Sequence, residues 1–226
     1  MPAASAPLRV TPRHIQLLRA VFAAVAALMI TFSPDHSHAV GLAVFGGFGI
    51  ATGLVFAIAA WLVAPAGRRG GPALLAAIHL VAGMAASIVT LRSDVLFFVV
   101  VIVWALLTGL IELLLGVTAR RRGEATRAAR TASRDAIVVG ALGLVLGVAL
   151  LFVSPEYALD YVIETKEGAL LPFTLTGTTI GVGLLGGYAA IVAVYLGIAG
   201  LSPEQQETDE ASVAEPAATA PQEERP

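Results

Sequence analysis

The chain of 226 residues has no cysteine, and only 13% of its residues are charged. The absence of cysteine excludes disulfide bonds, a thiolate nucleophile and metal sites built on thiolates. An ordinary soluble domain is about 25% charged and about 45 to 50% apolar. This chain is 57% hydrophobic and has a mean hydropathy of +0.84. The composition therefore excludes a soluble globule and indicates an integral membrane protein.

Long apolar runs are abundant, and six of them are long enough to cross a bilayer. A bilayer core about 30 Å thick needs about 20 apolar residues as a helix, and helices satisfy the backbone polar groups in hydrocarbon. We expect spans at residues 17–32, 39–64, 72–91, 95–119, 136–153 and 173–199. The sequence thus predicts an all-α, six-span helical bundle over residues 17–200.

The two flanking segments differ from this bundle. Residues 1–16 form a short N-terminal segment, and residues 201–226 form a tail rich in Glu, Ala and Pro that has little to bury and is expected to be disordered. The first span is the weakest, because Arg19 has to snorkel to the headgroups. An alternative for this span is a cleaved signal peptide, since Ser37-His38-Ala39 resembles a signal-peptidase site.

The basic residues predict the orientation of the spans. Eleven arginines fall on one side of the expected membrane: Arg9, Arg13, Arg19, Arg68, Arg69, Arg120, Arg121, Arg122, Arg127, Arg130 and Arg134. The connections on the other side carry only Arg92 and Lys166. Because basic loops stay in the cytoplasm, we expect a multi-pass protein of the inner (plasma) membrane with both termini cytoplasmic.

The turns on the outer side suggest an internal repeat. Similar segments recur at Phe32-Ser33-Pro34-Asp35, Leu91-Arg92-Ser93-Asp94 and Val153-Ser154-Pro155-Glu156. The spacing predicts three parallel helical hairpins in series. The third hairpin carries an insertion, residues 157–172, which is typical of either an interfacial segment or a partner surface.

Two glycine-containing segments resemble a known family. Trp104-Ala-Leu-Leu-Thr-Gly109-Leu-Ile-Glu112 and Gly140-Ala-Leu-Gly143-Leu-Val-Leu-Gly147 are similar to the HdeD acid-resistance membrane proteins. The resemblance covers roughly residues 17–199 and implies six spans in two-helix repeats. It also implies a non-enzymatic inner-membrane protein associated with acid or envelope stress, with no catalytic residue and no cofactor. The first hairpin, the insertion and the acidic tail depart from the family pattern.

Glycines spaced four residues apart indicate close helix packing. This spacing lets two backbones approach, and it predicts packing roles for Gly49, Gly53, Gly143, Gly147, Gly177 and Gly181, with Gly183 and Gly187 as a further pair. Gly109 is expected to pack as well, because it lies on a helix face of small residues. The segment from Gly181 to Gly186 also satisfies the G-x-G-x-x-G dinucleotide pattern. That pattern requires a preceding strand, whereas here it falls within an expected membrane span, so we interpret it as packing.

Glu112 is the one acid that falls inside an expected span. A charge in the middle of a membrane helix costs at least about 2.5 kcal/mol, so such a group usually faces the bundle or a wet cavity. Small residues surround Glu112 on its helix face, and His79 has a similar setting on the preceding span. We expect the two at similar depth as an intramembrane polar pair. Either Glu112 is structural, or it handles a proton or a ligand.

Two further groups of residues leave alternatives open. Asp35, His36 and His38 lie in the first outer turn and fit an ordinary polar loop, a pH response or a metal site. The cluster Arg120, Arg121, Arg122, Arg127, Arg130 and Arg134 fits a topology signal, contact with anionic lipids or docking of the acidic tail. The expected partners are membrane lipids, with a second copy or another membrane protein left open. Nucleic acid is not expected.

The sequence leaves two function classes. The first is a non-enzymatic, stress-associated membrane protein of the HdeD type, with neither a cofactor nor a metal. The alternative is a small transporter or proton-conducting protein that uses Glu112 and His79. An enzyme is disfavoured because one acid and one histidine inside the spans, without cysteine, do not make a nucleophile and base pair.

Overall fold

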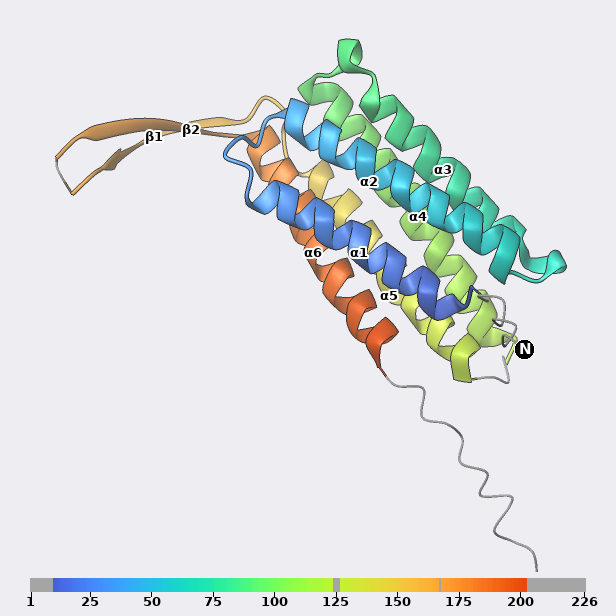
Figure 1. Ribbon diagram of the computed structural model, residues 1–226. Coiled ribbons are helices and arrows are strands. Elements are labelled where there is room, and N and C mark those ends of the chain that lie inside the picture. The colour runs from blue at the N-terminus through green and yellow to red at the C-terminus, as the bar shows by residue number, and fades with distance from the viewer. Residues whose placement is uncertain (1–9, 124–126, 167, 203–226) are drawn as a thin grey trace, which may run out of the picture.

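Six long helices form a bundle in the computed structural model of the chain, which describes residues 10–123, 127–166 and 168–202 (Figure 1). The helices are α1 (Pro12–Thr31), α2 (His38–Ile58), α3 (Gly70–Ser87), α4 (Asp94–Arg121), α5 (Arg127–Leu151) and α6 (Gly177–Leu201). A π-helical turn, Ala59–Val63, extends α2. Each helix is long and apolar enough to cross a membrane, which confirms the expectation of six spans.

Polar residues at the turns determine where several helices begin. The Ser93 hydroxyl accepts a hydrogen bond from the backbone N–H of Leu96, and the Thr176 hydroxyl accepts one from Thr179. Such caps satisfy donors that have no partner within the first helical turn. Helix α6 consequently begins at Gly177, four residues later than the sequence predicted, and α5 begins at Arg127, nine residues earlier.

A β-hairpin interrupts the helical pattern between α5 and α6. Strand β1 (Ala158–Glu164) pairs antiparallel with β2 (Leu170–Thr176). The expectation of an all-α fold is therefore wrong for the insertion, where apolar residues alternate with others at a period of two, which favours a strand. Figure 1 shows the hairpin projecting beyond one end of the bundle. We call this the hairpin end and the opposite one, which carries Arg68, Arg69 and Arg120 to Arg122, the basic end.

Extensive packing joins the helices in the pairs α2–α3, α4–α5 and α1–α6. The predicted hairpins α1–α2, α3–α4 and α5–α6 also pack together but less extensively, so the tightest pairs are not the predicted hairpins. The chain connects α2 to α3 and α4 to α5 at the basic end. The third tight pair consists of the first and last helices, α1 and α6. The similar turns therefore mark the junctions between packed pairs.

Glycine contacts explain the tightness of two of these pairs. A Cβ atom added at Gly49 of α2 would lie 3.0 Å from the Cα atom of Gly83 in α3, and one at Gly109 of α4 would lie 2.8 Å from the carbonyl oxygen of Gly140 in α5. Both distances leave no room for a side chain, so the paired backbones pack directly.

The other glycines expected to pack have different neighbours. Gly53 meets Leu80, Gly143 meets Gly109 and the Ala105 carbonyl, Gly147 meets Leu106, Gly177 meets the Ser154 carbonyl, and Gly181 meets Phe97 and Phe98. At Gly183 and Gly187 the structure places no described atom within 4 Å of an added Cβ. For that pair, packing within the chain is not found, because both residues lie on the outer face of α6.

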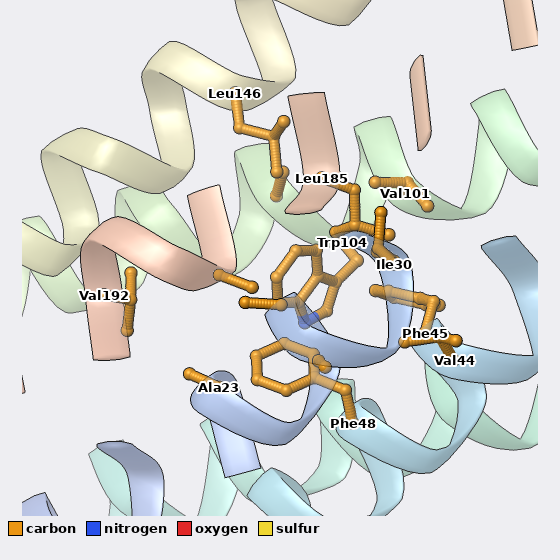
Figure 2. Close-up of a cluster of buried hydrophobic side chains, with 14 of the residues drawn as sticks. Ala23, Ile30, Val44, Phe45, Phe48, Val101, Trp104, Leu146, Leu185 and Val192 are labelled. Carbon is orange, nitrogen blue, oxygen red and sulfur yellow. The ribbon is translucent and has the colours of Figure 1, made fainter. Parts of the chain in front are cut away.

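Trp104 of α4 lies at the centre of the core (Figure 2). Its ring makes edge-to-face contacts with Phe45 and Phe48 of α2, with centroids 5.0 and 5.9 Å apart, and with Tyr188 of α6 at 5.8 Å. Its side chain is buried together with Ile30 of α1 and other apolar residues of the same cluster. This aromatic cluster therefore ties the three helix pairs together.

Candidate functional site

An ion pair joins α1 to α4 inside the bundle. The Arg19 guanidinium donates a hydrogen bond to Oε1 of Glu112 at 2.6 Å, and only 13% of the Arg19 side chain and 5% of the Glu112 side chain are exposed. The expectation that Arg19 snorkels to the headgroups is therefore wrong. A carboxylate within reach in the bundle interior offers the guanidinium a better partner than the lipid surface does.

Glu112 has unused hydrogen-bonding capacity. Its second oxygen, Oε2, is buried and has no hydrogen-bond partner among the described residues. The hydroxyl of the partly buried Tyr188 lies within electrostatic range of both Glu112 and Arg19. A buried carboxylate oxygen without a donor is costly, so this position suits a proton, a water molecule or another small donor.

His79 lies close to this ion pair but does not contact Glu112 directly. Arg19 stacks over the ring of Phe56 at 4.5 Å, and the ring centroids of Phe56 and His79 are 5.1 Å apart. The polar partner of Glu112 is thus Arg19, and among the described residues no hydrogen bond or ion pair joins Glu112 to His79. Sequence reasoning missed Arg19 as a partner because it lies 93 residues from Glu112.

The orientation of the His79 ring follows from a bond to its own helix. Nδ1 lies 2.8 Å from the carbonyl oxygen of Leu75, and because a carbonyl only accepts, Nδ1 carries the hydrogen. The ring then packs edge-to-face on Trp104, with centroids 5.5 Å apart. In the neutral ring Nε2 is the acceptor, so His79 can receive a proton without losing its bond to Leu75.

A second buried acid, Asp135 of α5, lies near the ion pair. The Tyr195 hydroxyl donates to Oδ1 of Asp135 at 2.9 Å, and the Gln16 amide donates to Oδ2. Arg19 is also within electrostatic range of Asp135. Because the fifth span was expected to begin at Ala136, Asp135 fell outside it, and the prediction that Glu112 is the one acid inside a span is wrong.

Two neighbouring groups of buried polar side chains lie in the half of the bundle toward the basic end. Asp135 with Gln16 and Tyr195 forms the first group, and Arg19 with Glu112 forms the second. Thr108 lies one helical turn from Glu112 toward the hairpin end of α4. Thr52 lies one turn from Phe56 on α2, and His79 packs on the same Phe56 ring. Beyond them Trp104, Phe45 and other large apolar side chains fill the core toward the hairpin end. We call these the polar half and the apolar half after the side chains that distinguish them, although apolar residues such as Phe56 and Leu75 are also buried in the polar half.

The polar residues of the first turn at the hairpin end do not gather into one site. Asp35 accepts hydrogen bonds from the backbone and hydroxyl of Ser37, whereas His38 lies 3.1 Å from Asp94 of α4. Asp94 also accepts a 2.5 Å hydrogen bond from Thr178 of α6. In the described part of the chain no group of three His, Cys, Asp or Glu side chains is arranged to hold a metal. These contacts link α2, α4 and α6.

The arginines at the basic end lie mostly at the surface. Arg120, Arg121, Arg122, Arg130 and Arg134 are exposed, and the side chain of Arg127 lies outside the described residues. Arg134 also lies within electrostatic range of Asp135 and Tyr195. The acidic tail from residue 203 onward, with its expected disorder and docking, likewise lies outside the described residues.

An apolar groove of about 370 Å³ runs between α3 and α4 on the outside of the bundle. Its walls come from residues such as Ile78 and Val81 of α3 and Val103 and Leu107 of α4, with Trp104 at its floor. A groove with such walls in a membrane span suits hydrocarbon and offers no polar ligand site.

Comparison of the chain with protein-family models, with curated proteins and with solved structures finds no match.

Proposed function

We propose that this multi-span membrane protein is a non-enzymatic inner-membrane protein of the HdeD type, and that the Arg19–Glu112 ion pair is its acid-responsive element. One observation carries the proposal: a carboxylate buried between α1 and α4 holds a guanidinium with one oxygen and leaves the other without a partner. Protonation of Glu112 would remove the charge that keeps Arg19 inside the bundle. Acidification would thereby loosen α1 from α4.

The proposed orientation places this element within reach of cytoplasmic protons. The basic end carries most of the arginines, which favours the cytoplasmic side, and the polar half of the bundle begins there with Gln16, Asp135 and Tyr195. The apolar half around Trp104 separates the ion pair from the hairpin end. A fall in cytoplasmic pH, rather than outside pH, is therefore the proposed signal.

The test uses variants that remove titration and retain shape. In a strain that depends on this protein for acid survival, Glu112→Gln is expected to reduce survival at low pH, because the amide cannot change charge. Glu156→Gln, an exposed carboxylate, is the matched control and is expected to behave like the wild type. Wild-type survival with Glu112→Gln together with loss in Glu112→Leu would leave only a structural role for Glu112 and contradict the proposal.

A small transporter or proton-conducting protein is the second candidate. Its support is three of the four buried polar atoms without a partner in the described chain, namely Thr52 Oγ1, Trp104 Nε1 and Glu112 Oε2; the fourth, Arg92 Nε, lies in the connection between α3 and α4 at the hairpin end. Water at such atoms would extend the polar half of the bundle. Proton flux into reconstituted vesicles separates the candidates: conduction requires flux that Glu112→Gln and His79→Phe both abolish, whereas the first proposal requires no flux in the wild type.

A further inference from the structure

The β-hairpin has one wholly apolar face. Alternate residues of a strand point to the same side, so Leu159, Tyr161 and Ile163 share a face with their cross-strand partners Leu175, Phe173 and Leu171. Tyr161 and Phe173 stack with ring centroids 5.8 Å apart. The face is therefore continuous from the base of the hairpin to its tip.

The opposite face is more polar. It carries Asp160 and Glu164 of β1, and the Thr174 hydroxyl of β2 donates a 2.6 Å hydrogen bond to Asp160. Ala158, Val162, Pro172 and Leu170 lie on the same side, so this face mixes apolar with polar residues, whereas the other face has no acid and no threonine. The hairpin is thus amphipathic, with its two faces set by the register of seven residue pairs.

No described part of the chain covers the apolar face. Tyr161, Ile163 and Phe173 are 43 to 46% exposed, and Figure 1 shows the hairpin extending away from the helices rather than folding back over them. A lone two-stranded hairpin is at best marginally stable in water. An exposed face of large apolar side chains usually marks a contact surface.

The size of the face argues against a second copy as its cover. Seven residues span about 23 Å and two strands about 10 Å, which gives a footprint on the order of 230 Å². Two such faces stacked together would bury roughly 500 Å² by this measure, below the about 1,200 Å² of a stable interface. A dimer held by this face alone is therefore disfavoured.

The attachment of the hairpin argues for the bilayer. Strand β2 runs directly into α6 without a loop, and the Gly177 N–H donates a 2.8 Å hydrogen bond to the carbonyl of Tyr157. The base of the hairpin is thereby fixed at the start of a membrane span. Tyrosine and phenylalanine at this level are typical of the membrane interface, where a ring meets both headgroups and acyl chains.

We propose that the hairpin is a membrane-surface anchor, whose Leu159–Tyr161–Ile163 face with Leu171, Phe173 and Leu175 rests in the lipid interface beside α6. The polar face with Asp160 and Glu164 then points to water. The partner that this apolar face contacts is therefore the lipid bilayer. This inference does not depend on the proposed role of Glu112.

The absence of cysteine makes a direct test simple. Ile163→Cys on the apolar face and Val162→Cys on the opposite face are labelled singly with a polarity-sensitive fluorophore in vesicles of phosphatidylcholine and phosphatidylglycerol. We expect doxyl-labelled lipid to quench the label at 163 several-fold more than the label at 162, and aqueous iodide to show the reverse order. Leu171→Cys and Pro172→Cys repeat the comparison on the partner strand.

The alternatives give different outcomes. Equal quenching by iodide at both positions would overturn the proposal, because the apolar face would then lie in water. If the label at 163 is protected from iodide at high protein density but not at one protein copy per vesicle, the proposal is also overturned, and the face is assigned to a second copy. A Phe173→Asp change is expected to lower lipid quenching at 171 while the helical content by circular dichroism stays unchanged, which separates loss of anchoring from unfolding of the bundle.

Discussion

Arg19 and Glu112 lie 93 residues apart in sequence, and the guanidinium of Arg19 meets the carboxylate of Glu112 at 2.6 Å inside the bundle. The contact connects the first helix of the chain to the fourth. Because α1 packs mainly with α6, this ion pair is a polar link between two different packed pairs.

Removal of one partner of this ion pair is expected to destabilise the fold more than removal of both. Arg19→Met or Glu112→Leu alone leaves a buried charge without its partner, which costs about 3 to 5 kcal/mol, whereas the double variant leaves no charge. Chemical unfolding of the protein in detergent measures the three stabilities. Additive losses in the double variant would show that the two side chains are not coupled.

A side chain at Gly109 is expected to separate α4 from α5. An added Cβ lies 2.8 Å from backbone atoms of Gly140 and Leu144, and backbone cannot move aside as a side chain can. Gly109→Leu should lower stability by about 1 to 3 kcal/mol or more through overpacking. Gly183→Leu is the control, since no described atom lies within 4 Å of that position. Equal thermal midpoints for both variants would contradict the packing assignment.

Loss of the Tyr195 hydroxyl is expected to destabilise the hydrogen-bonded group formed by Asp135, Gln16 and Tyr195. Tyr195→Phe keeps the ring and removes the donor to Asp135, and a hydrogen bond to a charged group contributes about 1.5 to 3 kcal/mol. Tyr161→Phe on the exposed hairpin should change the free energy of unfolding little. A Tyr195→Phe protein as stable as the wild type would mean that Asp135 finds another donor.

The expected orientation is open to a labelling experiment. Lys166→Cys lies near the turn of the hairpin and Gly67→Cys in the connection between α2 and α3 at the basic end. A membrane-impermeant maleimide added to intact spheroplasts should label position 166 and should reach position 67 only after lysis. The reverse pattern would place the basic end outside.

Anionic lipid is expected to stabilise the protein through the exposed arginines of the basic end. Each Lys or Arg near an anionic surface contributes about 1 kcal/mol, so Arg120, Arg121 and Arg122 changed together to Gln should reduce the gain in thermal midpoint on addition of phosphatidylglycerol. Arg92 and Lys166 changed to Gln serve as the control. An undiminished gain in the triple variant would leave these arginines with a role in topology only.

The sequence predicts the spans well because hydropathy and length are local properties. Glu112 could be singled out for the same reason, since a carboxylate among small residues in an apolar run is visible without any partner. The pairing with Arg19 could not be predicted, because nothing local in the first span specifies which distant helix it meets. Arg19 was accordingly assigned to the lipid surface.

The remaining differences also have physical causes. Asp135 lies one residue before the predicted start of the fifth span, whereas helix α5 begins at Arg127 and buries the carboxylate against Tyr195. The β-hairpin had a usable signal in the alternation of Leu159, Tyr161 and Ile163, but the apolar residues of β2 extended the predicted sixth span back to Phe173. The pairing of helices depends on which glycine-containing faces contact each other. The four-residue spacing of the glycines does not specify which helix is the partner.

The pairing of α1 with α6 determines the order in which helix contacts form during synthesis. About 145 residues separate Thr31 from Gly177, and at about 5 to 20 residues per second roughly 7 to 30 s pass between them. During that time α1 is in the membrane without its main partner, and Arg19 has no carboxylate until α4 has been made. The α1–α6 interface therefore closes last, and a nascent chain that stops before Gly177 leaves the α6-facing side of its first helix without that partner.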